Sequence, residues 1–188
     1  MEKYTIKDTL LWITRTSALI ALLIVFQWGL GALTGSNQYI VGSSVNLVLI
    51  IAATVSGLYS GITVAVLSPF LAYFLSVGPQ FIAMIPFIAL GNLVLVLIWY
   101  FIAKNANATA SGYVRMSVAL VVGAVVKFGV LYFSIVKFAI PNLLSLPAAK
   151  VSVMSLMFSW PQLVTAAIGG FIALLIIPTL RKVVRNII

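Results

Sequence analysis

Apolar residues occur in long runs along this chain, rather than in the short periodic stripes of a soluble helix or strand. We place the runs at residues 10–33, 44–60, 62–77, 80–103, 113–138 and 159–180. A bilayer-spanning helix needs about 20 apolar residues, because the hydrocarbon core is about 30 Å thick. The pattern predicts an all-α integral membrane protein, a compact bundle of about six transmembrane helices forming a single domain over residues 1–188.

Polar and turn-forming residues separate these runs. Residues 34–44 are rich in Gly, Ser, Asn and Gln and predict a polar first loop. The third run is short and contains Pro69, so we expect a kink there. Residues 141–157 form the longest connection, which we expect to be partly helical.

The distribution of cations predicts the orientation in the membrane, because cytoplasmic loops carry an excess of Lys and Arg. With the N-terminus inside, the outer side would hold Lys137 and Lys150, and the cytoplasmic side would hold Lys3, Lys7, Lys104, Arg115, Arg181, Lys182 and Arg185. We therefore expect both termini to be cytoplasmic. The first apolar run is too long for the core of a signal peptide, so we interpret it as a retained helix.

Composition supports a membrane protein and argues against several functions. With 63% hydrophobic and 7% charged residues, a chain of 188 residues cannot cover a soluble domain with polar surface. The net charge of +9 is assigned to topology rather than to nucleic-acid binding. Cys and His are absent, and the two acidic residues, Glu2 and Asp8, precede or begin the first helix. We therefore expect no enzyme, no metal site and no self-powered transporter.

Amide and aromatic side chains gather toward the outer ends of the predicted helices, with a few deeper in the membrane. Such groups suit a small, flat, polar ligand, although aromatic rings also anchor membrane interfaces and amides also join helices. The candidate substrate-binding residues are Gln27, Trp28, Asn37, Gln38, Tyr39, Asn46, Tyr73, Gln80, Met84, Asn92, Lys127, Trp160 and Gln162.

Lys127 is the sharpest signal among these candidates. It lies about 18 Å along its helix from Arg115, well inside the apolar slab, where a free ammonium costs several kcal/mol. The sequence offers no carboxylate within the membrane to pair with it. We expect it to face a cavity or ligand, with snorkelling to the interface as the alternative.

Two segments, Val41–Val48 and Phe158–Thr165, together with about six helices and a polar first outer loop, resemble the substrate-binding S component of an energy-coupling factor (ECF) vitamin transporter. The resemblance implies an outer ligand pocket capped by the first loop, in a bacterial cell membrane. It also implies a transmembrane coupling protein and two cytoplasmic ATPases as partners. This chain would hold no cofactor, since ATP and Mg would be used by the ATPases.

The family's first helix usually carries alanines four residues apart that meet the coupling protein. Here Ala18 is followed at that spacing by a leucine, and the nearest small pair is Ser17 with Ala21. The resemblance therefore implies a partner interface around Ser17, Ala18 and Ala21.

The identity of the ligand is left open by the sequence. The absence of acidic residues from the predicted pocket argues against a cationic vitamin such as thiamine. General likeness favours a hydroxymethylpyrimidine- or pyridoxine-like ring, with pantothenate and cobalamin as further candidates. Two other functions fit the same sequence: a non-transporting membrane subunit that organises a partner complex, and a stand-alone facilitator.

Overall fold

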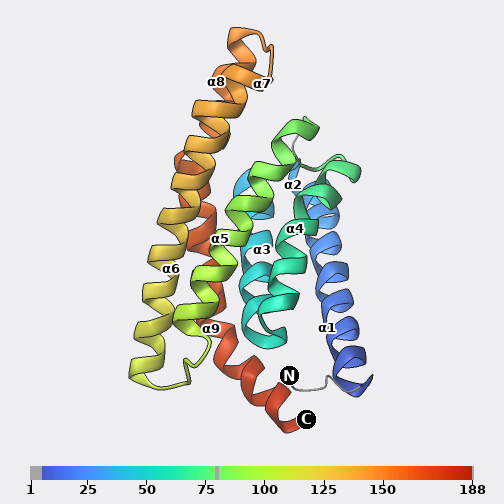
Figure 1. Cartoon of the computed structure of the whole chain (residues 1–188), viewed down its shortest axis with the longest axis vertical. Coiled ribbons are helices and arrows are strands. Elements are labelled where there is room, and N and C mark those ends of the chain that lie inside the picture. The colour runs from blue at the N-terminus through green and yellow to red at the C-terminus, as the bar shows by residue number, and fades with distance from the viewer. Residues whose placement is uncertain (1–5, 79–80, 188) are drawn as a thin grey trace.

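The computed structural model describes residues 6–78 and 81–187, which are folded almost entirely into helices (Figure 1). Three of the elements, η1, η2 and η4, are wider π-helical turns within longer helices, and η3 is a 3₁₀ turn. In chain order the elements are α1 (Ile6–Ile24), η1 (Val25–Leu30), α2 (Gly31–Thr34), α3 (Gln38–Ile51), η2 (Ala52–Ser56), α4 (Leu58–Phe74), η3 (Ile82–Met84), α5 (Ile85–Ala103), α6 (Ala110–Leu131), η4 (Tyr132–Ala139), α7 (Ile140–Leu143), α8 (Ala148–Met157) and α9 (Trp160–Ile187).

Within the described residues, five helical stretches are long and apolar enough to cross a membrane. They are Ile6–Thr34, Gln38–Ser56, Ile82–Ala103, Ala110–Leu143 and Ala148–Val183. The apolar helix α4 lies between the second and third of them and has 17 residues, about 25 Å by helical rise. The chain is thus a multi-pass membrane protein, and its short third helix agrees with the prediction.

These five stretches and α4, called passes below and numbered in chain order, alternate in direction and pack into one bundle (Figure 1). The helix α4 packs between α1 and α5, α6 packs between α5 and α9, and α3 packs between α9 and η1. The described chain begins and ends at the same end of the bundle, and α2, α7 and α8 lie at the opposite end (Figure 1). The connection at residues 141–157 is partly helical, as predicted, and contains α8.

The second pass differs from its predicted range of 44–60. It begins at Gln38, because the side chain of Asn37 caps the helix by accepting hydrogen bonds from the backbone N–H groups of Tyr39 and Ile40. It ends before Gly57, whose φ of 91° lies in the region that favours glycine. The third pass therefore starts at Leu58 rather than at residue 62.

The other passes differ from prediction mainly at their ends. The first begins at Ile6 instead of residue 10, and the last extends to Ile187 instead of residue 180. The fifth is the stretch Ala110–Leu143, longer than the predicted 113–138 because η4 and α7 continue α6. The fourth is α5 with η3 before it, and the predicted start at Gln80 lies outside the described residues.

The half of the bundle near the chain ends is closed by an apolar core and a few hydrogen bonds. Trp99 is fully buried and donates from Nε1 to Thr54 Oγ1 at 2.8 Å. Thr16 and Ser60 join α1 to α4 through their hydroxyl groups at 2.8 Å. Arg181 donates to the backbone carbonyls of Ala103, Lys104 and Ala106 at the end of α5. The carbonyl of Ala103 also accepts from the backbone N–H of Ala106, and the hydrogen bonds from Arg181 tie α9 to the end of α5.

Helices α3 and α9 approach each other at glycines. A Cβ atom added at Gly169 would overlap the carbonyl oxygen of Ser43 and lie 3.0 Å from the backbone nitrogen of Leu47. A Cβ atom at Gly42 would lie 3.0 Å from Thr165 Cγ2. Small residues at these positions let the two backbones pack closely, as is common between helices in lipid.

Gly169→Ala should lower the free energy of unfolding by about 1–3 kcal/mol, because the neighbours of its Cβ include two backbone atoms that cannot rotate away. Thermal unfolding in detergent measures the change. The matched control is Gly129→Ala on α6, where a Cβ atom meets nothing within 4 Å. Equal melting temperatures for the two variants would contradict the close packing of α3 and α9.

Candidate ligand-binding site

A cavity of about 530 Å³ lies at the end of the bundle opposite the chain ends. Its walls come from every pass and from the two connections that follow α2 and α4. The volume falls within the range of small-molecule sites. The lining side chains are those of Gln27, Ser36, Gln38, Val41, Val45, Asn46, Ser68, Pro69, Ala72, Val77, Ile88, Asn92, Lys127, Ala149, Lys150, Val153, Met154, Met157, Phe158 and Gln162.

Lys127 on α6 lies at the floor of this cavity and is only 3% exposed. Its Nζ donates to Asn46 Oδ1 at 2.5 Å and to Asn92 Oδ1 at 2.7 Å. The two asparagines come from α3 and α5, so the lysine joins three helices. The ammonium is therefore held inside the bundle by amide oxygens instead of snorkelling to the membrane surface.

Backbone carbonyls fix the direction of this hydrogen-bond chain. The Ser68 and Thr165 hydroxyls donate to the carbonyls of Ala65 and Gln162. Each hydroxyl then accepts from an asparagine amide nitrogen: Asn92 Nδ2 donates to Ser68 Oγ at 2.9 Å, and Asn46 Nδ2 donates to Thr165 Oγ1 at 3.3 Å. The amide oxygens are thereby turned toward Lys127, which acts as donor to both.

Pro69 explains why a serine is needed beside it. Proline has no backbone N–H, so the carbonyl of Ala65, four residues earlier on α4, loses its usual helical partner. The hydroxyl of Ser68 donates to this carbonyl at 3.1 Å and satisfies it. The proline thus creates an acceptor, and that acceptor orients the serine within the network.

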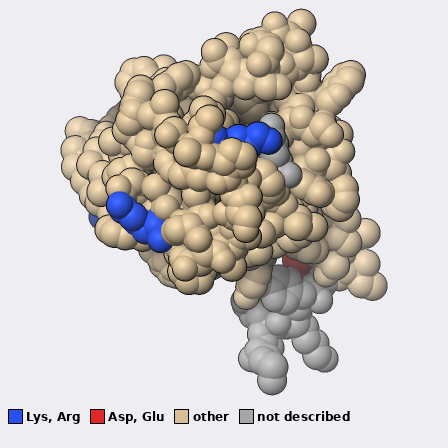
Figure 2. All heavy atoms as spheres, turned by 90° about the horizontal axis from the view of Figure 1, so that it is seen from above, with Lys and Arg blue, Asp and Glu red and all other residues tan. Residues whose placement is uncertain are grey.

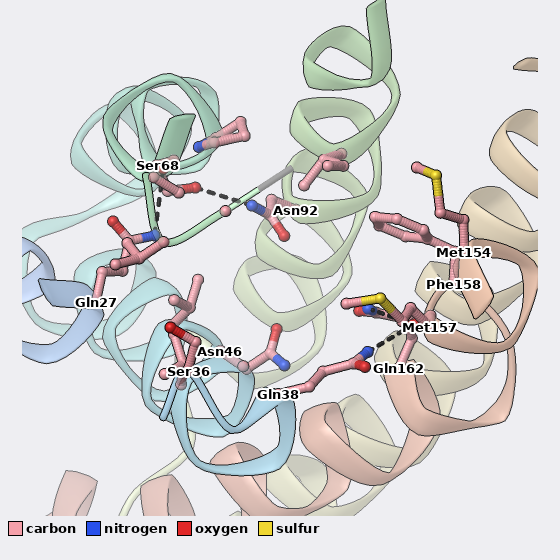
Figure 3. A pocket seen from close by; sticks show the side chains of 18 of the residues that line it. Gln27, Ser36, Gln38, Asn46, Ser68, Asn92, Met154, Met157, Phe158 and Gln162 are labelled. Carbon is pink, nitrogen blue, oxygen red and sulfur yellow. Dashed lines mark hydrogen bonds between the residues drawn. The ribbon is translucent and has the colours of Figure 1, made fainter. Parts of the chain in front are cut away.

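Gln27 extends the network to the first pass. It lies in the π-helical turn η1 and donates from Nε2 to the backbone carbonyl of Ser68 at 3.3 Å, as Figure 3 shows. With Gln27, the network takes one side chain from each pass: Gln27, Asn46, Ser68, Asn92, Lys127 and Thr165. π-Helical turns are frequent at functional sites.

Helix α8 forms an apolar wall on the opposite side of the cavity. Val153, Met154, Met157 and Phe158, from the last turns of α8 and its end, line the cavity together. The backbone carbonyl of Met157 accepts from Gln38 Nε2 at 2.6 Å and from Gln162 Nε2 at 3.0 Å, and both glutamines point toward it in Figure 3. Two side-chain hydrogen bonds therefore join this wall to α3 and α9.

The charges that line the cavity are positive. Lys127 lies at the floor and Lys150 lies on the first turn of α8, whereas no acidic side chain lines the cavity. Seen from this end, the described surface carries isolated blue side chains and is otherwise almost uncharged (Figure 2). The arrangement can hold and orient a small molecule through amides, one buried cation and an apolar wall.

The structure brings together part of the predicted site. Gln27, Gln38, Asn46, Asn92, Lys127 and Gln162 all line the cavity. Asn37 lies outside it and caps α3, and Gln80 lies outside the described residues. The predicted and observed sets therefore share mainly amides and the lysine.

The predicted aromatic residues and the predicted methionine are placed elsewhere. Trp28 is 60% exposed on the surface of the first pass. Tyr39 packs against Trp160 with ring centroids 6.2 Å apart, and Tyr73 packs edge-on against the neighbouring phenylalanine. Met84 is fully buried in an apolar cluster with Leu131, Ile135 and Ile140. None of these side chains lines the cavity.

Several lining residues were not predicted from the sequence. Ser68 gives a faint signal, since it directly precedes the proline of a short apolar run. The wall of α8 could have been found from the spacing of Val153, Met154, Met157 and Phe158, which places apolar residues on one side of a helix in a connecting segment. Lys150 was predicted only as an outer cation.

A double-mutant cycle tests the network. Asn92→Leu should destabilise the protein by about 1–3 kcal/mol, because it leaves the buried ammonium with one acceptor. The same substitution should lower the free energy of unfolding by less in a Lys127→Met background. Denaturant unfolding should give a coupling energy of at least about 0.5 kcal/mol.

The control cycle pairs Lys127→Met with Thr16→Val, which breaks the separate Thr16–Ser60 hydrogen bond. These two changes should be additive within about 0.5 kcal/mol. Additivity in both cycles would mean that Asn92 does not stabilise Lys127.

Comparison with known proteins gives no assignment for this chain. No protein-family model, curated protein or solved structure matches it. The observations that bear on function are thus the cavity, its buried lysine and the side chains that surround them.

Proposed function

We propose that this protein is the substrate-binding S component of an ECF-type vitamin importer in a bacterial cell membrane. It would capture a small vitamin or vitamin precursor on the outer side. A transmembrane coupling protein and two cytoplasmic ATPases would then drive its delivery inward. The observation that carries the proposal is the cavity at one end of the bundle, whose lining includes a hydrogen-bonding side chain from every pass.

The position of the cavity supports capture from outside. It lies at the end of the bundle opposite the chain ends, which the positive-inside pattern assigns to the cytoplasm. Ser36 and Gln38, at the first outer connection, take part in its lining. This agrees with the outer pocket, capped by the first loop, that the family resemblance implies.

The size of the cavity supports a small cargo. A volume of about 530 Å³ suits a pyrimidine or pyridine vitamin precursor or pantothenate. Cobalamin, a corrinoid far larger than a drug-sized ligand, is less well matched. The amides at the floor and the apolar wall of α8 suit a molecule with both polar groups and an apolar body.

The separation of binding from energy supply has two supports. The sequence contains no phosphate-cradling loop ending in Lys and Ser or Thr, and no acidic residue beyond Asp8, in the first turn of the first helix. The predicted partner interface is accessible, since Ser17, Ala18 and Ala21 are all exposed on α1. Small exposed side chains let another helix approach closely in lipid.

Binding is tested with the purified protein in detergent and a panel of B vitamins and their precursors. A ligand that binds only the folded state raises the melting temperature. At a ligand concentration a hundredfold above Kd, the free energy of unfolding increases by about 2.7 kcal/mol. Val41→Trp should abolish the shift, because Val41 lines the cavity and the larger ring would fill it.

The control for this variant is Val125→Trp, at an exposed position on α6 away from the cavity, which should keep the shift. No shift with any vitamin, in a sample that unfolds cooperatively, would favour a subunit that only organises a partner complex.

Transport is tested in vesicles that contain the protein with or without its coupling protein and ATPases. Uptake of the bound vitamin should require the partners and ATP. Ala21→Trp should abolish uptake and leave ligand binding unchanged, because Ala21 is exposed on α1 and lies outside the cavity lining. Val114→Trp, exposed on α6, is the matched control. Uptake by the protein alone would instead identify a stand-alone facilitator.

A further inference from the structure

We infer that the ligand is a small organic molecule with one carboxylate and an apolar body, and that the carboxylate binds Lys127. The inference rests on the proposed binding function and narrows it to one chemical class. Within the vitamins considered above, it favours a carboxylate such as pantothenate over a neutral ring such as pyridoxine.

The first support is the charge balance at the cavity floor. The partners of Lys127 are two neutral amide oxygens, which provide dipoles but no negative charge. Among the described residues the one acidic side chain is that of Asp8, in the first turn of α1. In a low-dielectric site, an uncompensated charge is costly. One carboxylate bound to Lys127 would supply the missing charge.

The second support is the number of hydrogen-bond donors. A lysine ammonium carries three N–H groups, and Lys127 makes two hydrogen bonds within the described residues. The remaining donor belongs to a side chain that lines the cavity. A carboxylate oxygen is the strongest acceptor for it, because the hydrogen bond is then assisted by charge on both sides.

The third support is Lys150, which is exposed and also lines the cavity. A cation near the opening attracts anions and raises their rate of arrival. With Lys127 deeper inside and no acidic residue in the lining, an anion would meet positive charge along the cavity.

The apolar body of the ligand is assigned to the wall of α8. Val153, Met154, Met157 and Phe158 present aliphatic, thioether and aromatic surface to the cavity. Methionine side chains adapt to ligands of irregular shape. A carboxylate at the floor and an apolar segment beside α8 would satisfy both sides of the cavity together.

The test uses pairs of probes that share a body and differ in the carboxylate: pantothenate and pantothenol, 4-pyridoxate and pyridoxine, nicotinate and nicotinamide. Dissociation constants are measured by calorimetry with the full-length protein in detergent. The carboxylate member of at least one pair should bind at least about tenfold more tightly, as expected for a charge-assisted hydrogen bond. Lys127→Met should remove this preference, and Lys127→Arg should keep part of it.

Lys150→Met should slow association of the carboxylate member at low salt. The control is Lys137→Met, at an exposed lysine outside the cavity lining, which should leave the preference for the carboxylate within about threefold of wild type. Tighter binding of a neutral member in every pair that binds, or a preference that survives in Lys127→Met, would overturn the carboxylate assignment and leave the binding function intact. Binding of no probe or vitamin would overturn both. If Lys127→Met does not fold, the probe pairs measured with the wild-type protein still decide the charge of the ligand. Lys127→Arg then decides whether residue 127 binds the carboxylate.

Discussion

The rest of this structure depends on one constraint: an ammonium group lies inside a membrane bundle whose sequence offers no carboxylate beyond Asp8, in the first turn of α1. Lys127 is stabilised by amide oxygens from two other helices, and those amides are oriented by hydroxyls that in turn donate to backbone carbonyls. Each step satisfies a polar group that would be costly to bury alone. The network therefore fixes how the helices meet at the floor of the cavity, although most of the protein is held by apolar packing.

The cavity and the closed half of the bundle have different chemistry for a physical reason. Near the chain ends, Trp99 and its apolar neighbours fill the space between the helices, and Arg181 satisfies the carbonyls at the end of α5. At the other end, glycines bring α3 and α9 close, while Pro69 and the π-helical turn at η1 alter the regular helix. Irregular backbone at membrane depth is tolerated where protein groups satisfy it or where it lines a cavity. The cavity thus lies where regular helical packing is interrupted.

The helical membrane fold was predictable because the apolar runs are long and polar residues separate them. Lys127, Asn46 and Asn92 were predictable as site residues because polar side chains are rare within such runs. The faces of the helices were not predictable, since spans that are apolar on all sides give no periodic signal. Trp28 and Tyr73 therefore could not be separated from aromatic anchors, and Ser68 could not be distinguished from other serines of the helices. The cap at Asn37 shifted the second helix because a local side-chain contact outweighed the polar composition of the segment.

The attachment of α8 lets the wall of the cavity open on a time scale different from that of unfolding of the bundle. None of its residues is fully buried, and its end is held by two glutamine side chains that share the carbonyl of Met157. The wall also packs through Val151, Met154 and Phe158 against the apolar cluster around Met84, so opening would break these contacts and the two hydrogen bonds but leave the lysine network in place. Opening is then a local event with its own free energy. The residence time of a bound molecule and the lifetime of the folded bundle are then governed by different contacts. Substitutions at Gln38 or Gln162 would change the first and leave the second nearly constant.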